Sequence, residues 1–227
     1  MTKISWNSVG ERIFETGVDR GVFYPLLGEG VPWNGLISVA QTPSGGEPEP
    51  YYQDGFKYMN RSTPEEFEGT IEAYTYPDEF EACDGTLELV DGLLASQQRR
   101  SAFDLTYRTL IGNDVDGDRH AYKLHLVYNV LVAPAPREFT TNDDTVDATT
   151  FTWDFTTSPI VVPTVLKPVA HLIVNTKTAD PAKIVSLEDI LYGTDDDSAR
   201  MIRPEEIIEL FHDIPEDEFT LTFGGSF

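Results

Sequence analysis

The segment Asn113–Asp118, with the sequence Asn-Asp-Val-Asp-Gly-Asp, is the nearest approach to a metal-binding pattern in this chain. A calcium-binding EF-hand loop has acids at alternate positions, an early glycine that makes the sharp turn and a closing glutamate. Here Gly117 comes too early in the loop, and His125 stands where the closing glutamate should be. We therefore predict a hairpin turn at this segment and no metal site.

The histidines and the single cysteine also lack the spacing of a reactive site. His120 and His125 are an odd number of residues apart, so on one regular strand they point to opposite faces, which argues against a shared zinc ion. His171 and His212 are isolated from them in the sequence. Cys83 has no neighbouring Cys-His pattern, so we predict a buried, unreactive thiol.

Other catalytic patterns are equally absent from the sequence. It contains neither a glycine-rich phosphate loop nor a nucleophile elbow. Acids that could serve glycoside hydrolysis are abundant, but no pair of them stands out. We therefore predict that the protein is not an enzyme and that it has no catalytic residues, no cofactor and no metal ion.

The charge balance narrows the choice of partners. The chain of 227 residues has 39 acids against 16 Lys and Arg, a formal net charge of −23. This composition argues against conventional nucleic-acid binding, which needs a basic surface. The charge also suits solubility or a host with high salt. Cys83 is the only cysteine, so no disulfide can form within the chain, which suits folding in a cytoplasmic compartment. No signal peptide or membrane-spanning run is evident, and we expect no membrane partner.

A strand with one acidic face is predicted for residues 66–76. Thr63–Glu66 fits a helix capping box, but the residues that follow alternate with a period of two, which favours a strand. The apolar face of this strand comprises Phe67, Gly69, Ile71, Ala73 and Thr75. The opposite, acidic face comprises Glu66, Glu68, Thr70 and Glu72. Pro77 ends the strand because it cannot donate to a ladder.

Residues 42–62 are predicted to form a projecting loop. Asp54-Gly55 is the dipeptide of a tight hairpin turn, and aromatic residues flank it on both sides. The polar, flexible connection before it contains Pro43, Gly45 and Gly46. This loop either contacts a neighbouring molecule or is a mobile surface loop that contacts nothing.

The remaining elements are mostly strands. The longest are 103–111 and 120–132, joined by the turn at 112–119; in the second strand every even-numbered residue from His120 to Val132 is expected on one face. Such a pair suits either a barrel shared between subunits or a large sandwich. Shorter strands are expected at 21–27, 33–41, 86–90, 151–156, 159–163 and 168–176, with a turn at Asp91-Gly92 after the third of them. Short helices are expected at 187–192, capped by Ser186, and at 203–211.

Several segments, in the same order along the chain, resemble the major tail tube proteins of long-tailed (siphovirus) bacteriophages, especially those that infect actinobacteria. The resemblance covers residues 17–212. The segments are GVDRGVFYPL, GVPWNGL, YYQDGFKYMN, GTIEAYTYPDEFEACDG, RSAFDLTYRTLIGND and YKLHLVYNVLVAPAPR and, more weakly, TFTWDFTTSPI, SLEDILYGT and RPEEIIELF. It implies a mainly β subunit, an antiparallel β-sandwich or barrel with one or two flanking short helices, between an N-terminal arm (1–16) and a C-terminal arm (213–227).

The resemblance also implies a function. Hexameric rings of the subunit would stack into the tail tube, which conducts the phage DNA during ejection without binding it specifically. The partners would be further copies of the chain, the tape measure protein, the tail terminator and the distal tail or baseplate proteins. The location would be the virion tail, assembled in the host cytoplasm. The alternatives are another tail or baseplate β protein, or a carbohydrate-binding or hydrolase β-sandwich.

Three groups of residues are the candidate sites under this interpretation. The acidic face of the strand at 66–76 would line the lumen of the tube or, alternatively, face the outside. The adjacent arginines would pair with carboxylates within or between subunits. The groups are a ring-stacking loop (Pro43, Gly45, Gly46, Tyr51, Tyr52, Asp54, Gly55), an acidic lumen face (Glu66, Glu68, Glu72) and two inter-subunit arginines (Arg99, Arg100).

Overall fold

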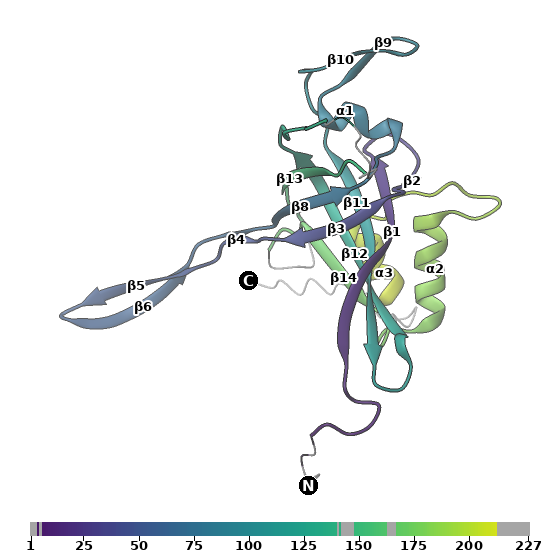
Figure 1. Cartoon of the computed structure of the whole chain (residues 1–227). Helices are drawn as coiled ribbons and strands as arrows, with labels where there is room; N and C mark the ends of the chain where they lie inside the picture. Colours follow the sequence, from purple (N-terminus) through teal and green to yellow (C-terminus); the bar gives the residue numbers. More distant parts are fainter. Residues whose placement is uncertain (1–3, 5, 140, 142–147, 163–166, 213–227) are drawn as a thin grey trace, which may run out of the picture.

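Eight antiparallel strands form one large sheet in the computed structural model, which describes residues 4, 6–139, 141, 148–162 and 167–212 (Figure 1). The order across the sheet is β2-β1-β11-β12-β13-β8-β3. β14 lies off this path and pairs with Lys123–Val127 of β12, whereas β13 pairs with residues 130–132 of the same strand. The strands are β1 (Phe14–Pro25), β2 (Val31–Pro32), β3 (Leu36–Gln41), β8 (Glu68–Ala73), β11 (Phe103–Asn113), β12 (Gly117–Val132), β13 (Phe151–Thr157) and β14 (His171–Asn175). The prediction of a mainly β antiparallel fold is therefore confirmed.

The sheet curls strongly but does not close into a barrel within the described residues. Its two edge strands, β2 and β3, are neighbours in the sequence, and the short loop 33–35 connects them. The Trp33 N–H donates to the Gly21 carbonyl of β1, and the Tyr74 N–H beyond β8 donates to the Gly35 carbonyl, both at 2.8 Å. The loop thus bridges the two edges where a closed barrel would have a strand ladder.

The two faces of the sheet bury different kinds of core. The concave face surrounds an aromatic cluster that includes Phe23, Trp33, Phe103 and Trp153, all between 0 and 3% exposed. On the other face, Tyr24 of β1 and three residues of β12, Leu124, Leu126 and Tyr128, pack against two helices. The covering layer on that side consists of the short flanking helices that the sequence predicts.

A bulge in β12 overturns the predicted alternation of this strand. Asn129 has a positive φ of 49°, and the register with β11 shifts between the pairs Leu105–Val127 and Phe103–Val130. Val130 therefore joins Val127 in the aromatic core, on the face opposite Leu126. The Asn129 N–H is held by the buried Asp104 carboxylate at 2.7 Å, a partner 25 positions away.

The helices lie at the flanks of the sheet. The short helices η1 (Asp78–Phe80) and α1 (Glu81–Asp84) bring Phe80 and Cys83 into the aromatic cluster. α2 (Pro181–Tyr192) and α3 (Pro204–Phe211) cover the other face. α3 begins at a proline and α2 ends at Gly193, as predicted. α2 begins earlier than predicted, because Asp180 rather than Ser186 is its N-cap.

Three small two-stranded ribbons stand outside the sheet. They are β4 (Ser44–Gly45) with β7 (Glu65–Glu66), β5 (Pro48–Gln53) with β6 (Phe56–Ser62), and β9 (Leu87–Val90) with β10 (Leu93–Ala95). The last residues of the predicted N-terminal arm (1–16), Phe14–Thr16, belong to β1 and pair with β11. The predicted C-terminal arm at 213–227 lies outside the described residues. Among the described helices, none is long and apolar enough to span a membrane.

Candidate interaction surfaces

Residues 42–66, which we term the hairpin arm, project from the sheet as an extension of β3 and β8 (Figure 1). Its two strands are hydrogen-bonded from base to tip: Thr42 N–H to the Glu68 carbonyl (2.9 Å), then β4 with β7, then Gly46 N–H to the Pro64 carbonyl (3.3 Å), then β5 with β6. Twelve residues of extended chain reach about 40 Å. The arm is therefore a continuous ribbon about as long as a strand of the main sheet.

The tip of the arm has the turn chemistry that the sequence indicates. Asp54 and Gly55 both have positive φ, 50° and 81°, as a type I′ hairpin requires. Gly45 at the base also has a positive φ, and a Cβ there would lie 2.3 Å from the Pro64 carbonyl oxygen. These glycines fix the path of the arm.

The side chains of the arm have almost no cover. Every residue from Thr42 to Glu66 is exposed, apart from Gly46, which is half-buried. The large apolar side chains are Tyr51, Tyr52, Phe56, Tyr58 and Met59, between 43 and 78% exposed. A two-stranded ribbon without a covered face is marginally stable in water, and a cluster of exposed apolar side chains is typical of an interaction surface.

Most of the predicted acidic face lies on β8. Gly69, Ile71 and Ala73 are buried, whereas Glu68 and Glu72 lie on the half-buried opposite side. The Cβ that Gly69 lacks would clash with the Ala40 carbonyl oxygen and the Phe155 ring. The third predicted acid, Glu66, lies in β7 at the base of the arm and is fully exposed.

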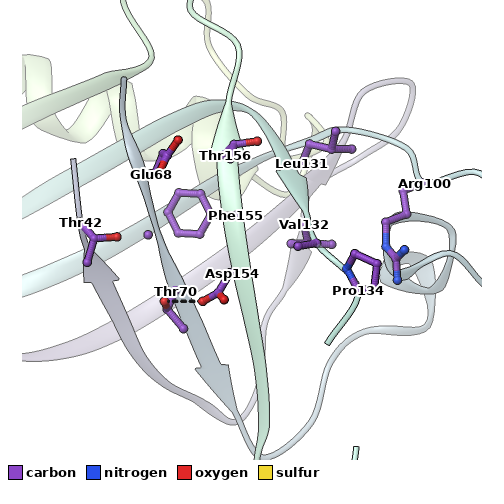
Figure 2. Close-up of a pocket in the computed structure, with 12 residues that line it drawn as sticks. Thr42, Glu68, Thr70, Arg100, Leu131, Val132, Pro134, Asp154, Phe155 and Thr156 are labelled. Carbon is purple, nitrogen blue, oxygen red and sulfur yellow. Dashed lines mark hydrogen bonds between the residues drawn. The ribbon is translucent and has the colours of Figure 1, made fainter. Parts of the chain in front are cut away.

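A further acid, which sequence reasoning did not single out, extends this face. Asp154 of β13 pairs with Thr70 of β8 in the ladder and accepts a hydrogen bond of 2.8 Å from its hydroxyl (Figure 2). Glu68, Thr70 and Asp154 line an open groove of about 680 Å³ that runs along β8 and β13 to Arg100. The alternation Thr-Trp-Asp-Phe in β13 carried the signal, since Trp153 and Phe155 are buried and Asp154 is exposed.

The two predicted inter-subunit arginines are in different situations. Arg100 is held within the chain: it donates to the Asp84 backbone carbonyl at 2.7 Å, and its guanidinium lies 3.8 Å from the Asp84 carboxylate. Arg137 and Trp153 also contact that carboxylate. Arg99 is exposed, so of the two it is the one with a free approach from outside.

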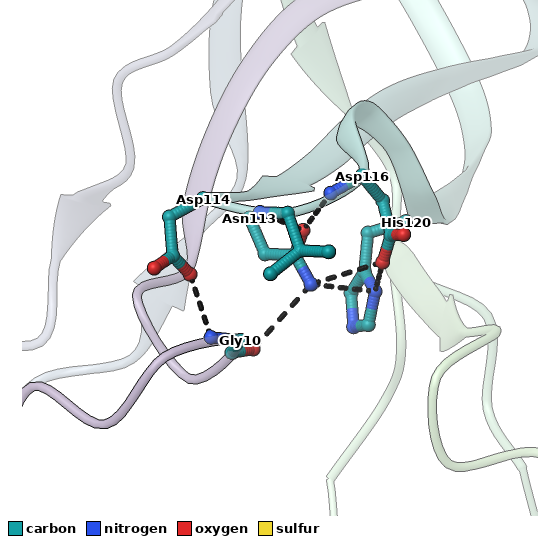
Figure 3. A network of polar contacts seen from close by, with 6 residues as sticks. Gly10, Asn113, Asp114, Asp116 and His120 are labelled. Atoms are coloured by element: carbon teal, nitrogen blue, oxygen red, sulfur yellow. Dashed lines mark hydrogen bonds and ion pairs between the residues drawn. The ribbon is translucent and has the colours of Figure 1, made fainter.

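The side chains of Asn113 and Asp116 hold the predicted turn at 112–119 together (Figure 3). The Asn113 side-chain oxygen accepts from the backbone N–H groups of Val115 and Asp116, and its amide nitrogen lies 3.1 Å from the Asp116 carboxylate. His120 and Asn113 donate hydrogen bonds that lower the pKa of Asp116. Asp114 accepts from the Gly10 N–H at 2.9 Å, which ties the N-terminal segment to the turn.

Two histidines that the sequence separates by 46 residues form a pair, in which His125 is buried and His171 is half-buried. His125 Nδ1 lies 3.0 Å from His171 Nε2, and His125 Nε2 lies 3.0 Å from the Thr109 hydroxyl. Tyr107 stacks on His125, and the Phe67 ring packs against His171 at a tilt of 31°. Burial lowers the pKa of each histidine to about 4, so both are neutral near pH 7. Among the described residues, no group of three or more potential His, Cys, Asp or Glu ligands comes together.

The β9–β10 hairpin is a second apolar surface, which sequence reasoning treated only as a short strand and a turn. Both of its strands carry exposed aliphatic side chains: Leu87, Leu89, Val90, Leu93 and Leu94, between 46 and 62% exposed. Cys83, just before it in α1, is buried as predicted, and burial raises the pKa of its thiol to about 12. The available signal was the Asp91-Gly92 turn between two aliphatic runs.

Comparison with known proteins adds little to this description. No family model matches the chain, and no curated protein matches it significantly. Among solved structures, the chain is similar to a chain in the cryo-EM structure of the anti-feeding prophage baseplate, symmetrised with six-fold symmetry, at a TM-score of 0.39 and 9% identity. The similarity covers 77% of this chain and 99% of that one. A TM-score this low assigns neither a fold family nor a function.

Proposed function

We propose that this protein is a structural subunit of a virion, the major tail tube protein of a long-tailed bacteriophage. Six copies form a ring, and rings stack into the tube through which the DNA leaves. The observation that carries the proposal is the hairpin arm, a ribbon hydrogen-bonded along its length whose aromatic side chains have no cover within the subunit. The sequence resemblance over residues 17–212 supports the same assignment.

The arm is suited to assembly because of the way it is built. Its two strands are paired along most of its length, with one register shift between Tyr51 and Tyr52, so it keeps its direction without a hydrophobic core of its own. Burial of its exposed aromatic side chains against a partner lowers the free energy of the assembly. A reach of about 40 Å carries them well beyond their own sheet, to a subunit of the adjacent ring.

The charge of the chain suits a conduit for DNA. The subunit has a formal charge of −23, and Glu68, Glu72 and Asp154 lie together on the non-core side of β8 and β13. We assign this face to the lumen, where carboxylates repel the passing phosphates and give DNA no cation to bind. Glu66, at the base of the arm, lies at the edge of the same face.

The other components of the tail follow from this role. The ends of a tube must be closed by proteins of a different kind, here a tail terminator at one end and distal tail or baseplate proteins at the other, with a tape measure protein inside during assembly. The location is then the virion tail, after assembly in the host cytoplasm. The proposal gives the protein no catalytic activity, cofactor or metal ion.

Electron microscopy of the purified, concentrated protein tests the assignment. The wild type is expected to form tubes many rings long. A matched variant replaces Glu47–Thr63 with Asn-Gly, which removes β5 and β6 together and leaves the pairs Ser44–Glu66 and Gly45–Glu65 intact. It removes three acids and two bases, so the net charge changes by one unit only. We expect this variant to stay folded and to stop at single rings.

Each alternative function gives a different result in the same experiment. A tail or baseplate component of another kind would give single rings from the wild type at any concentration. A carbohydrate-binding β protein would stay monomeric, and an oligosaccharide would raise its melting temperature. Long tubes from the variant without β5 and β6 would remove the stacking role of the arm.

A further inference from the structure

The β9–β10 hairpin and strand β6 of the hairpin arm are the two surfaces that this inference connects. Both expose large apolar side chains, and both belong to two-stranded ribbons outside the main sheet. In Figure 1 the β9–β10 hairpin stands beyond α1 at one end of the molecule, whereas the arm leaves from the side, far from it. The arm therefore cannot cover the hairpin of its own subunit.

The charges of the two surfaces are complementary. β6, with the sequence Phe-Lys-Tyr-Met-Asn-Arg-Ser, carries Lys57 and Arg61 and no acid, although the whole chain has only 16 Lys and Arg against 39 acids. The β9–β10 hairpin carries Glu88 and Asp91 and no base. Between two such surfaces, charge pairing adds specificity and correct register to the burial of apolar side chains.

Strand β5 of the arm is a poorer match for the hairpin. It contains Glu49, which would meet Glu88 and Asp91 with the same sign of charge. Pro48 and Pro50 also remove two backbone donors from this strand. β6 has no proline, so its edge keeps its full set of donors and acceptors for a further strand.

We infer that the β9–β10 hairpin of one subunit is the docking site for strand β6 of the arm of a second copy of this chain. Phe56, Tyr58 and Met59 pack on the aliphatic side chains of the hairpin, while Lys57 and Arg61 pair with Glu88 and Asp91. Because the two surfaces lie on different parts of the subunit, the contact is heterologous and leaves a free arm and a free hairpin at the two ends, so it can continue from ring to ring. The inference rests on the proposed function and names the acceptor of the arm.

Charge exchange between the two surfaces tests the inference in the full-length protein. K57E/R61E and E88K/D91K are each expected to reduce the amount of protein in tubes at least tenfold, and the combination of all four is expected to restore it. R119E/K177E, at two exposed sites on other elements, changes the net charge by the same four units as K57E/R61E and is expected to assemble normally. Normal tubes from both single-surface variants would overturn the inference while the tube assignment stands.

A mixing experiment separates the inference from the proposed function. The variant without β5 and β6 keeps only the acceptor, and E88K/D91K keeps an intact arm with a damaged acceptor. Sedimentation of the two together is expected to show a heterocomplex that neither forms alone. When K57E/R61E is added to the arm partner, this partner assembles with itself, and the variant without β5 and β6 should be absent from the sedimenting complex. The heterocomplex would support the inference even if the wild type formed no tubes. Tubes from the wild type without any heterocomplex would refute it, and another partner of the hairpin would then have to be sought.

Discussion

The hairpin arm and the β11–β12 pair are both long antiparallel ribbons, but only one of them is covered. β11 and β12 pair from Phe103–Val130 to Asn113–Gly117, with the aromatic cluster on one face and α2 and α3 on the other. The arm has a ladder of comparable reach, and its side chains face solvent on both sides. Backbone hydrogen bonding gives both ribbons their shape, whereas burial of apolar surface stabilises only the first.

This difference divides the work between the two regions. The buried ribbon supplies the free energy of folding, and the exposed ribbon keeps apolar surface for a partner without contributing much to the stability of the subunit. Substitutions in the two ribbons should therefore have opposite signatures. Those in β11 and β12 should lower the free energy of unfolding, and those in the arm should impair assembly at unchanged stability.

The largest effect on stability is expected from Phe103→Ala in β11. The Phe103 ring is fully buried and lies 5.1 Å from the ring of Phe23 and 5.4 Å from that of Phe80, between centroids. Removing it leaves a cavity that should lower the free energy of unfolding by about 3–5 kcal/mol, measured by urea denaturation. A loss below about 1 kcal/mol would show that the buried ribbon does not carry the stability.

The next effect in size is expected from acid, through the histidine pair between β12 and β14. The pKa of His125 falls from 6.5 to about 4 on folding, so the unfolded chain binds more protons between these values. The stability from the neutral histidine is therefore complete above pH 6.5 and is lost as the pH falls from 6.5 towards 4. At about 1.4 kcal/mol per pKa unit, His125 alone accounts for up to about 3 kcal/mol.

The comparison that isolates this effect is His171→Phe, which keeps a ring against Phe67 and removes one titrating group from the pair. Its free energy of unfolding, measured between pH 4 and pH 7, should depend less steeply on pH than that of the wild type. Equal slopes for the two proteins would mean that the pair does not resist protonation in the folded state. The arm contains no histidine, so the variant lacking β5 and β6 should keep the wild-type slope.

The smallest effect on stability is expected from Phe56→Ala with Tyr58→Ala at the tip of the arm. These side chains are 78 and 70% exposed, so the free energy of unfolding should change by less than about 0.5 kcal/mol. Tube formation, followed by light scattering and microscopy, should nevertheless be lost. Val185→Ala, at a 58% exposed apolar residue of α2, is the control and should assemble normally. Loss of stability without loss of tubes would reverse the roles of the two ribbons.

The sequence by itself determined those features that depend on neighbouring residues. Asp54-Gly55 specified a hairpin turn and Asp91-Gly92 a turn, because turn geometry is set by the residues in the turn itself. Alternation in β8 and β13 identified their buried faces, and proline and glycine placed the start of α3 and the end of α2. It also identified residues 42–62 as a projecting element, although not as a ribbon paired from base to tip.

Tertiary structure alone decided the features that depend on distant partners. The bulge at Asn129 is held by Asp104 on the neighbouring strand, and no sequence pattern within β12 predicts it. His125 and His171 meet because β14 pairs with β12, and Asp154 joins the acids of β8 because β13 pairs with β8. The β9–β10 hairpin contains as many aliphatic residues as a core strand, and only the arrangement of the whole chain leaves it uncovered. Burial is a property of what packs against a segment, so periodicity shows which face is apolar but not whether another element covers it.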